Sequence, residues 1–242
     1  MRSAFILLLG AVLSLPLGAQ TPERVATVTG TAVTRGDLTS GAGAVSAEAR
    51  LLEILWPRIA GDYVAGHGLA ASPAEIEEAL AYHRAFERSD RAQRARKLAE
   101  LNERLADAEL APEERARLED FQAVLRRLAQ ADQDHARTPP VPVAQQRELV
   151  IGSIEMWKLN RALYERYGGV VGLSNWGPWP YGARAALIAD YERLGLLEFA
   201  DNELRERLYA WVRRPPPVAV PPDQVDFTPY WKRPIPPSYF RD

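Results

Sequence analysis

One histidine and one serine are considered first as candidate catalytic residues. His67 lies between two glycines within YVAGHGLAASPAEIEEAL, residues 63–80, and Ser174 lies in GLSNWG. A nucleophile elbow would have its second glycine one position earlier, so Ser174 is not expected to act as a nucleophile. The glycines around His67 and the Ser-Pro pair after it are typical of a corner between two helices, where a cation at the end of the first helix is mildly favoured. We therefore interpret His67 as a corner residue.

A pair of histidines raises the question of a metal site. His83 and His135 would come within a turn or two of each other if the chain between them folds back on itself, with Asp132 and Asp134 nearby. Such a set could serve a metal-dependent hydrolase, but it lacks the tight spacing of zinc motifs. The sequence also contains no Walker loop, dinucleotide-binding glycine fingerprint or paired-histidine helix motif. We expect no metal, no cofactor and no catalytic residue.

Large aromatic residues favour a binding function instead. A groove lined by such side chains would suit extended, apolar peptide segments, which need apolar contact more than specific chemistry. The same residues can equally fill a core, because an apolar surface and an apolar interior leave the same sequence pattern. The candidate peptide-binding residues are Trp56, Tyr63, Trp157, Tyr164, Trp176 and Trp179.

Composition and charge exclude several classes of protein. Nearly half of the 242 residues are hydrophobic, enough for a sizeable core. Without Arg2, 29 basic residues face 32 acidic ones, so the chain lacks the basic excess that nucleic-acid binding requires. The sequence has no cysteine. Disulfides, a thiol nucleophile and Cys-ligated zinc are therefore excluded.

The first 19 residues have the pattern of a secretory signal peptide. Arg2 precedes AFILLLGAVLSLPL, an apolar stretch too short to span a bilayer, and LGA supplies a small-residue cleavage site. Cleavage there would leave Gln20 as the first residue. Bacterial lipoproteins carry Cys at that place, so no lipid anchor is expected. We predict an exported protein, most naturally a periplasmic one.

The first mature segments predict a short β element and a kinked helix. VATVTGTAVT, residues 25–34, is typical of a short hairpin or extended arm. From Ser46 to about residue 66, apolar residues recur at the spacing of one buried helix face. Pro57 lies inside this pattern and should kink the helix rather than end it. SPAE, residues 72–75, is a capping box that begins the next helix.

Residues 73 to about 136 predict an antiparallel helical hairpin. Leucines step by three and four before an interruption near residues 107–112, and apolar residues do so again after it. Pro112 is a sound start for the second arm. A short connection between matching apolar seams brings the two arms together, with the tip near residues 108–111.

The rest of the chain predicts further helices and then an extended tail. A helix over 143–167, with Leu149 among its apolar residues, is expected to be central and buried. VVGL, residues 170–173, is expected to pair as a strand with the N-terminal VATV, and SNWGPWPYG to form a loop. One helix should follow over 187–194 and another after its cap, Asp201. The final 30 residues contain nine prolines, which excludes helix and predicts a polyproline-like tail.

Residues 25–80 carry a resemblance to a known family. VATVTGTAVTRGDL resembles the V-x-x-V-N-G-x-x-I-T-x-x-E-L opening of the SurA-type chaperone module of periplasmic peptidyl-prolyl isomerases, although Thr29 replaces the usual Asn. LLEILWPRIAGDYVAGHGLAASPAEIEEAL is similar to the helix, corner and helix start that follow in that module. The helix over 143–167 would correspond to the later helix that packs back on it. Residues 80–143 are too few and too helical for a parvulin domain, so the resemblance implies a chaperone module without isomerase activity.

Together these observations predict a mainly α-helical fold: a SurA-N-like helical module with a short β element and a long antiparallel helical hairpin. The predicted function is non-catalytic binding of unfolded or extended polypeptide, outer-membrane proteins among the clients, in an apolar groove between the helices of 46–66 and 143–167. The alternatives are a peptidyl-prolyl isomerase-related protein and an assembly partner that docks through the hairpin or the tail. The expected segments are a signal peptide at 1–19, the SurA-N-like segment at 20–80, the hairpin insertion at 81–137, the C-terminal helices at 138–214 and the Pro-rich tail at 215–242.

Overall fold

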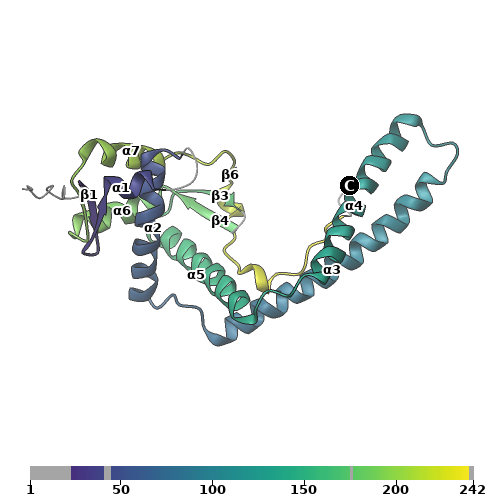
Figure 1. Ribbon diagram of the computed structural model, residues 1–242, viewed down its shortest axis with the longest axis horizontal. Coiled ribbons are helices and arrows are strands. Elements are labelled where there is room, and N and C mark those ends of the chain that lie inside the picture. The colour runs from purple at the N-terminus through teal and green to yellow at the C-terminus, as the bar shows by residue number, and fades with distance from the viewer. Residues whose placement is uncertain (1–22, 41–44, 175–176, 240–242) are drawn as a thin grey trace, which may run out of the picture.

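The computed structural model describes residues 23–40, 45–174 and 177–239. The molecule consists of a body and a long helical arm (Figure 1), and the predicted mainly helical fold is confirmed. The predicted signal peptide and Trp176 lie outside the described residues. Within the described part of the chain, no helix combines the length and the apolar character needed to cross a membrane.

The first sheet of the body joins two N-terminal strands to a strand that lies far along the chain. β1 (Arg24–Val28) and β2 (Thr31–Thr34) form a hairpin whose turn residues, Thr29 and Gly30, both have positive φ angles, 47° and 79°. On its other side β1 pairs antiparallel with β5 (Leu197–Phe199). The prediction that VATV pairs with VVGL is therefore wrong.

The second sheet has the order β4-β3-β6. β3 (Val170–Ser174) pairs with β4 (Gly177–Tyr181) on one side and with the two-residue β6 (Ala219–Val220) on the other. SNWGPWPYG was expected to be a loop, but its second half forms β4. Two prolines are tolerated there because β4 is an edge strand, where a missing N–H breaks no ladder bond on the outer side.

Five helices complete the body, and α2 continues through Pro57 without a break. Their apolar faces close on the first sheet, with Leu55, Leu163 and Leu208 among the fully buried side chains. Leu149 was expected to be buried but is 62% exposed, because α5 reaches beyond the body at that end. Leu194 follows the end of α6 and is also exposed. The helices are α1 (Arg35–Thr39), α2 (Ala47–Gly66), α5 (Val143–Tyr167), α6 (Ala183–Arg193) and α7 (Asn202–Val212).

The corner predicted around His67 is confirmed. The His67 ring stacks on Tyr63 at a centroid distance of 3.8 Å, and its Nδ1 lies 2.9 Å from the Tyr63 carbonyl oxygen. The next helix begins with both bonds of the predicted capping box between Ser72 and Glu75. Burial alone would raise the pKa of Glu75, but hydrogen bonds from Lys158 and Ser72 outweigh it and lower the pKa.

The arm is the predicted antiparallel hairpin, made by α3 (Pro73–Leu105) and α4 (Pro112–Arg137). Gln122 donates to Asn102 over 2.7 Å, and Arg104 pairs with Glu114 at 2.5 Å closer to the tip. Contacts therefore join residues further along α4 to residues earlier in α3, as antiparallel helices require.

The C-terminal tail folds back from the body onto the arm, drawn in yellow in Figure 1. It was predicted to contain no helix, but two short 3₁₀ turns, η1 (Pro222–Gln224) and η2 (Tyr230–Lys232), interrupt it. Trp231 of η2 closes a second core at the junction of α3 and α5. The buried members of this second core are Ile76, Ala79, Val150, Ile154, Trp157 and Trp231.

Candidate functional site

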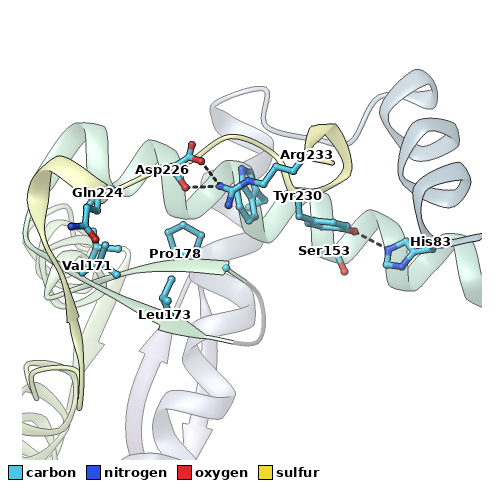
Figure 2. A pocket seen from close by; sticks show the side chains of 13 residues that line it. His83, Ser153, Val171, Leu173, Pro178, Gln224, Asp226, Tyr230 and Arg233 are labelled. Atoms are coloured by element: carbon cyan, nitrogen blue, oxygen red, sulfur yellow. Dashed lines mark hydrogen bonds and ion pairs between the residues drawn. The ribbon is translucent and has the colours of Figure 1, made fainter. Parts of the chain in front are cut away.

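The candidate site is a cleft of about 380 Å³ between α5, the second sheet and the tail, which we call the tail cleft. Figure 2 shows tail and sheet side chains converging on it from opposite sides. Its lining is mainly apolar, with a few polar groups at the arm end and along the tail. The lining residues are His83, Ser153, Trp157, Val171, Leu173, Gly177, Pro178, Val220, Gln224, Val225, Asp226, Tyr230 and Arg233.

The sheet side of the tail cleft follows from strand alternation and one glycine. Leu173 and Pro178 are opposite each other in the β3–β4 pair, so their side chains share one face. Gly177 has a φ of 95°, and a Cβ placed on it would lie 2.3 Å from Cζ3 of Trp157. A glycine at this position therefore allows the Trp157 ring to lie directly against the start of β4.

The other side of the tail cleft is an extended segment of the tail held by several kinds of contact. The indole Nε1 of Trp157 donates to the Phe227 carbonyl oxygen over 3.0 Å. The Phe227 ring packs on Tyr164 with centroids 5.2 Å apart. Arg233 pairs with Asp226 at 3.0 Å (Figure 2). Backbone, ring and charge contacts together fix an otherwise irregular segment.

The polar groups at the arm end of the tail cleft already have partners. His83 Nε2 lies 3.0 Å from the Tyr230 hydroxyl (Figure 2), and the Ser153 hydroxyl donates to the Leu149 carbonyl over 2.9 Å. Partial burial lowers the pKa of His83, opposed by the negative charge of Glu87. Burial raises the pKa of Tyr230. This arrangement suits hydrogen bonding and apolar contact better than nucleophilic attack.

The two histidines considered for a metal site have different surroundings. His83 contacts the tail, whereas His135 lines a smaller hollow on the arm with Phe86 and Asp132. Across the described ranges, no three His, Cys, Asp or Glu side chains are grouped so that they could hold a metal ion. Ser174 donates to the Gly177 carbonyl over 3.0 Å, across the end of the β3–β4 hairpin.

The structure places the predicted peptide-binding aromatics differently from one another. Trp56, Tyr63 and Trp157 are at most 6% exposed and belong to the two cores. Side chains of α2 and α5 pack together, so the groove expected between these helices is filled. Tyr164 and Trp179 are half-buried, the first against the tail. Of the described residues in this set, Trp157 alone lines the tail cleft.

Sequence reasoning missed the tail as a wall of the site. Val220, Val225 and Tyr230 come from a segment whose proline content predicts an extended chain but not its docking place. The one available signal was the clustering of aromatic residues in FTPYWKRP, which is unusual for a tail that stays in solvent.

Comparisons of the chain with protein-family models, curated proteins and solved structures give no match. The likeness of residues 25–80 to a SurA-type module remains a resemblance of sequence.

Proposed function

We propose that this protein binds unfolded or extended polypeptide by reversible apolar contact, without covalent chemistry, and that the tail cleft is the binding site. The observation that carries the proposal is the tail itself. From Ala219 to Tyr239 it crosses the second sheet, α5 and α3 without forming an α-helix. The surface beneath it is thus suited to an extended chain, and the tail is the occupant supplied by the same molecule.

The contacts of the tail are those by which proteins recognise extended peptides. Val220 adds to the edge of β3 as a strand, opposite Val171. A side-chain donor, Trp157, binds a tail carbonyl, and the Trp231 side chain inserts into an apolar core. Strand addition supplies affinity that does not depend on sequence, and pockets for alternate side chains supply preference. A client with similar apolar residues could use the same contacts.

The tail does not fill the surface completely. The tail cleft keeps about 380 Å³ of space beside it, a volume within the range of ligand sites. Leu173 at its sheet wall is 73% exposed, and Val218 at the neighbouring edge is 76% exposed. These apolar side chains would gain from contact with a client, since burial of apolar area is the main driving force of such association.

Export to the periplasm is part of this proposal. It is supported by the signal-like residues 1–19 and by the resemblance of residues 25–80 to a periplasmic chaperone module. Mass spectrometry of the protein made with its leader in a bacterial host should find Gln20 as the first residue, in the periplasmic fraction. An uncleaved chain in the cytoplasmic fraction would contradict this part.

The binding proposal is tested by suppression of aggregation. Residues 20–242, at near-stoichiometric ratio, should reduce light scattering by an unfolded outer-membrane protein diluted from denaturant. Leu173→Glu should weaken this effect, because a charge in an apolar wall opposes apolar binding. Leu194→Glu is the matched control: Leu194 is 58% exposed and does not line the tail cleft. Equal loss in both variants, or no suppression by folded wild-type protein, would overturn the proposal.

A second candidate function is docking to one assembly partner through the arm. Phe121, Val124 and Leu128 are 37%, 42% and 42% exposed, and their spacing places them on one side of α4. If the arm is a docking site, Val124→Glu should abolish capture of a specific partner from a periplasmic extract and leave aggregation suppression unchanged. Capture of the same partner by this variant would refute docking through the arm.

A further inference from the structure

A second cavity lies on the other face of the second sheet. Along paired strands side chains alternate between faces, so Leu173 and Pro178 face the tail cleft while Gly172 and Trp179 face the opposite side. The cavity on that side has a volume of about 400 Å³ and lies between β4, the start of α6 and the end of α7. Its two charged lining residues are both arginines, and we call it the arginine cavity.

Arg184 is the more enclosed of these arginines. Its guanidinium lies between two indoles, 4.2 Å from the ring centroid of Trp56 and 4.3 Å from that of Trp179. Its Nε is buried and has no hydrogen-bond partner in the structure, and none of the described acidic side chains forms an ion pair with it. Burial lowers its pKa to about 10. The Arg184 side chain as a whole is half-buried, and a partly buried cation without an anion is unfavourable, so the site would gain from a negatively charged ligand.

Arg214 adds a second positive charge at the mouth. It is exposed and stacks on Trp211, with its guanidinium carbon 4.1 Å from the ring centroid. The positive charge of Arg214 acts on Glu48, which lies 3.9 Å from Arg207 and does not line the arginine cavity. The described lining therefore carries two positive charges and no negative one.

The start of α6, like the two arginines, favours a negatively charged ligand. Gly182, the N-cap of this 11-residue helix, lines the arginine cavity and supplies no side-chain cap. The first N–H groups of a helix have no partner within the helix and favour a nearby anion. Arg184 is itself in the first turn, so the backbone and the guanidinium act on the same space.

The walls of the arginine cavity are aromatic. Trp179, Tyr181 and Trp211 line it beside the two guanidinium groups. From this combination we infer that the arginine cavity binds a carboxylate attached to an apolar or aromatic group, such as the C-terminal residue of a polypeptide. Guanidinium groups match carboxylate oxygens geometrically, and aromatic walls would hold the adjoining side chain. An inorganic anion would use the charges but leave the walls without contact.

The identification of a polypeptide end as the ligand rests on the proposed holding function. A client whose middle lies in the tail cleft would have its chain end recognised separately, on the opposite face of the same sheet. A small free carboxylic acid has the same chemistry, and the ligands of the test distinguish these two sources.

Binding is measured by isothermal titration calorimetry with N-acetyl-phenylalanine, its amide and inorganic phosphate, and with one apolar peptide ending in Phe as the free acid and as the amide. The free acids should bind at least tenfold more tightly than the amides and than phosphate. Tighter binding of the free-acid peptide than of N-acetyl-phenylalanine would identify a chain end as the ligand, and the reverse would identify a small acid. Equal binding of acid and amide, or of phosphate and acid, would overturn the inference.

Variants separate this site from the stability of the fold. Arg184→Met keeps an apolar stem between the indoles and removes the unpaired charge, so its melting temperature should stay equal or rise while acid binding falls at least tenfold. Arg214→Gln should weaken acid binding about threefold. Arg213→Gln is the control, because Arg213 is also exposed, contacts the Tyr209 ring at 4.9 Å and does not line the cavity. Unchanged acid affinity in folded Arg184→Met would overturn the inference.

The two proposals fail separately. Loss of acid binding in Arg184→Met together with full suppression of aggregation supports the arginine cavity as a site distinct from the tail cleft. Failure of wild-type protein to bind the free acids, with suppression intact, would overturn the arginine cavity alone. Acid binding without suppression would overturn the holding function and leave the small-acid ligand in place.

Discussion

Trp231 is expected to be the residue that anchors the tail to the rest of the protein. Its side chain is 7% exposed and belongs to the second core, next to Trp157. A buried tryptophan removes about 150–250 Å² from water, which at about 25 cal/mol/Å² contributes about 4–6 kcal/mol. Its Nε1 is buried without a hydrogen-bond partner among the described residues, which costs about 1–3 kcal/mol. Trp231 therefore stabilises docking of the tail by about 3 kcal/mol.

Trp231→Ala should release the tail while the first core stays folded. Because Trp231 inserts from a short 3₁₀ turn in an otherwise extended segment, its loss should leave the tail unanchored rather than open a sealed cavity. A loss of about 3 kcal/mol raises the opened fraction roughly a hundredfold. Hydrogen exchange measures this: the amides of Lys232, Arg233 and Ser238 donate within the tail or to α3 and should exchange roughly a hundredfold faster. Amides of α7, which belongs to the first core, should be unaffected.

Trp231→Phe is the control for this prediction. Phenylalanine keeps a ring in the second core and removes the unpartnered N–H, so the two effects offset each other and tail exchange should stay within about fivefold of the wild type. Unchanged tail exchange in Trp231→Ala would refute the assignment of Trp231 as the anchor. Simultaneous loss of protection in α7 would show instead that the tail and the first core unfold as one unit.

Three further predictions concern stability and pH. Gly177→Ala should lower the free energy of unfolding by about 2–4 kcal/mol in denaturant titration, because Gly177 has a positive φ and its new Cβ would meet Trp157. Gly195 also has a positive φ but lies in open space, so Gly195→Ala should lower the free energy of unfolding by only about 1–2 kcal/mol, and equal losses would contradict the argument. The pKa of Glu75 is lowered in the folded state, so its carboxylate stabilises the fold above about pH 4.5, and this stabilisation is lost as the pH falls through the lower folded pKa. In Glu75→Gln the free energy of unfolding should therefore depend less steeply on pH in that range, and an unchanged slope would count against the argument. The lowered pKa of His83 favours the docked tail above about pH 6.5, so tail exchange, corrected for intrinsic rates, should rise toward pH 5 in the wild type but not in His83→Asn.

Local chemistry made part of this fold predictable. The capping box at Ser72, the start of α4 at Pro112 and the N-cap Asp201 each depend on residues within one helical turn, and all three are found as predicted. The antiparallel pairing of the two arm helices also followed from the short interruption near residues 107–112. Such features depend on contacts near in sequence, or on a short turn that fixes which residues meet.

Strand pairing and the candidate sites could not be predicted in this way. β-branched residues in VATV indicate a strand but do not choose between VVGL and residues 197–199, since both contain apolar residues and both are distant in sequence. SNWGPWPYG was predicted to be a loop, whereas its second half is the edge strand β4. That place at the edge of the sheet depends on the partners of β3. Arg184 carried no motif. Its position between two indoles results from the meeting of α2, β4 and α6.

The first sheet cannot be completed until most of the chain has been synthesised. Arg35, just after β2, pairs with Asp201, just before α7, and the two residues are 166 positions apart. At about 5–20 residues per second, roughly 10–30 s of synthesis separate them. During that interval the edge of β1 that will pair with β5 has no native partner, whereas the helices of the arm can already pair with each other. The arm in the middle of the chain can thus fold first, whereas the sheet formed by the N-terminal strands is completed only by a strand from the last third of the sequence.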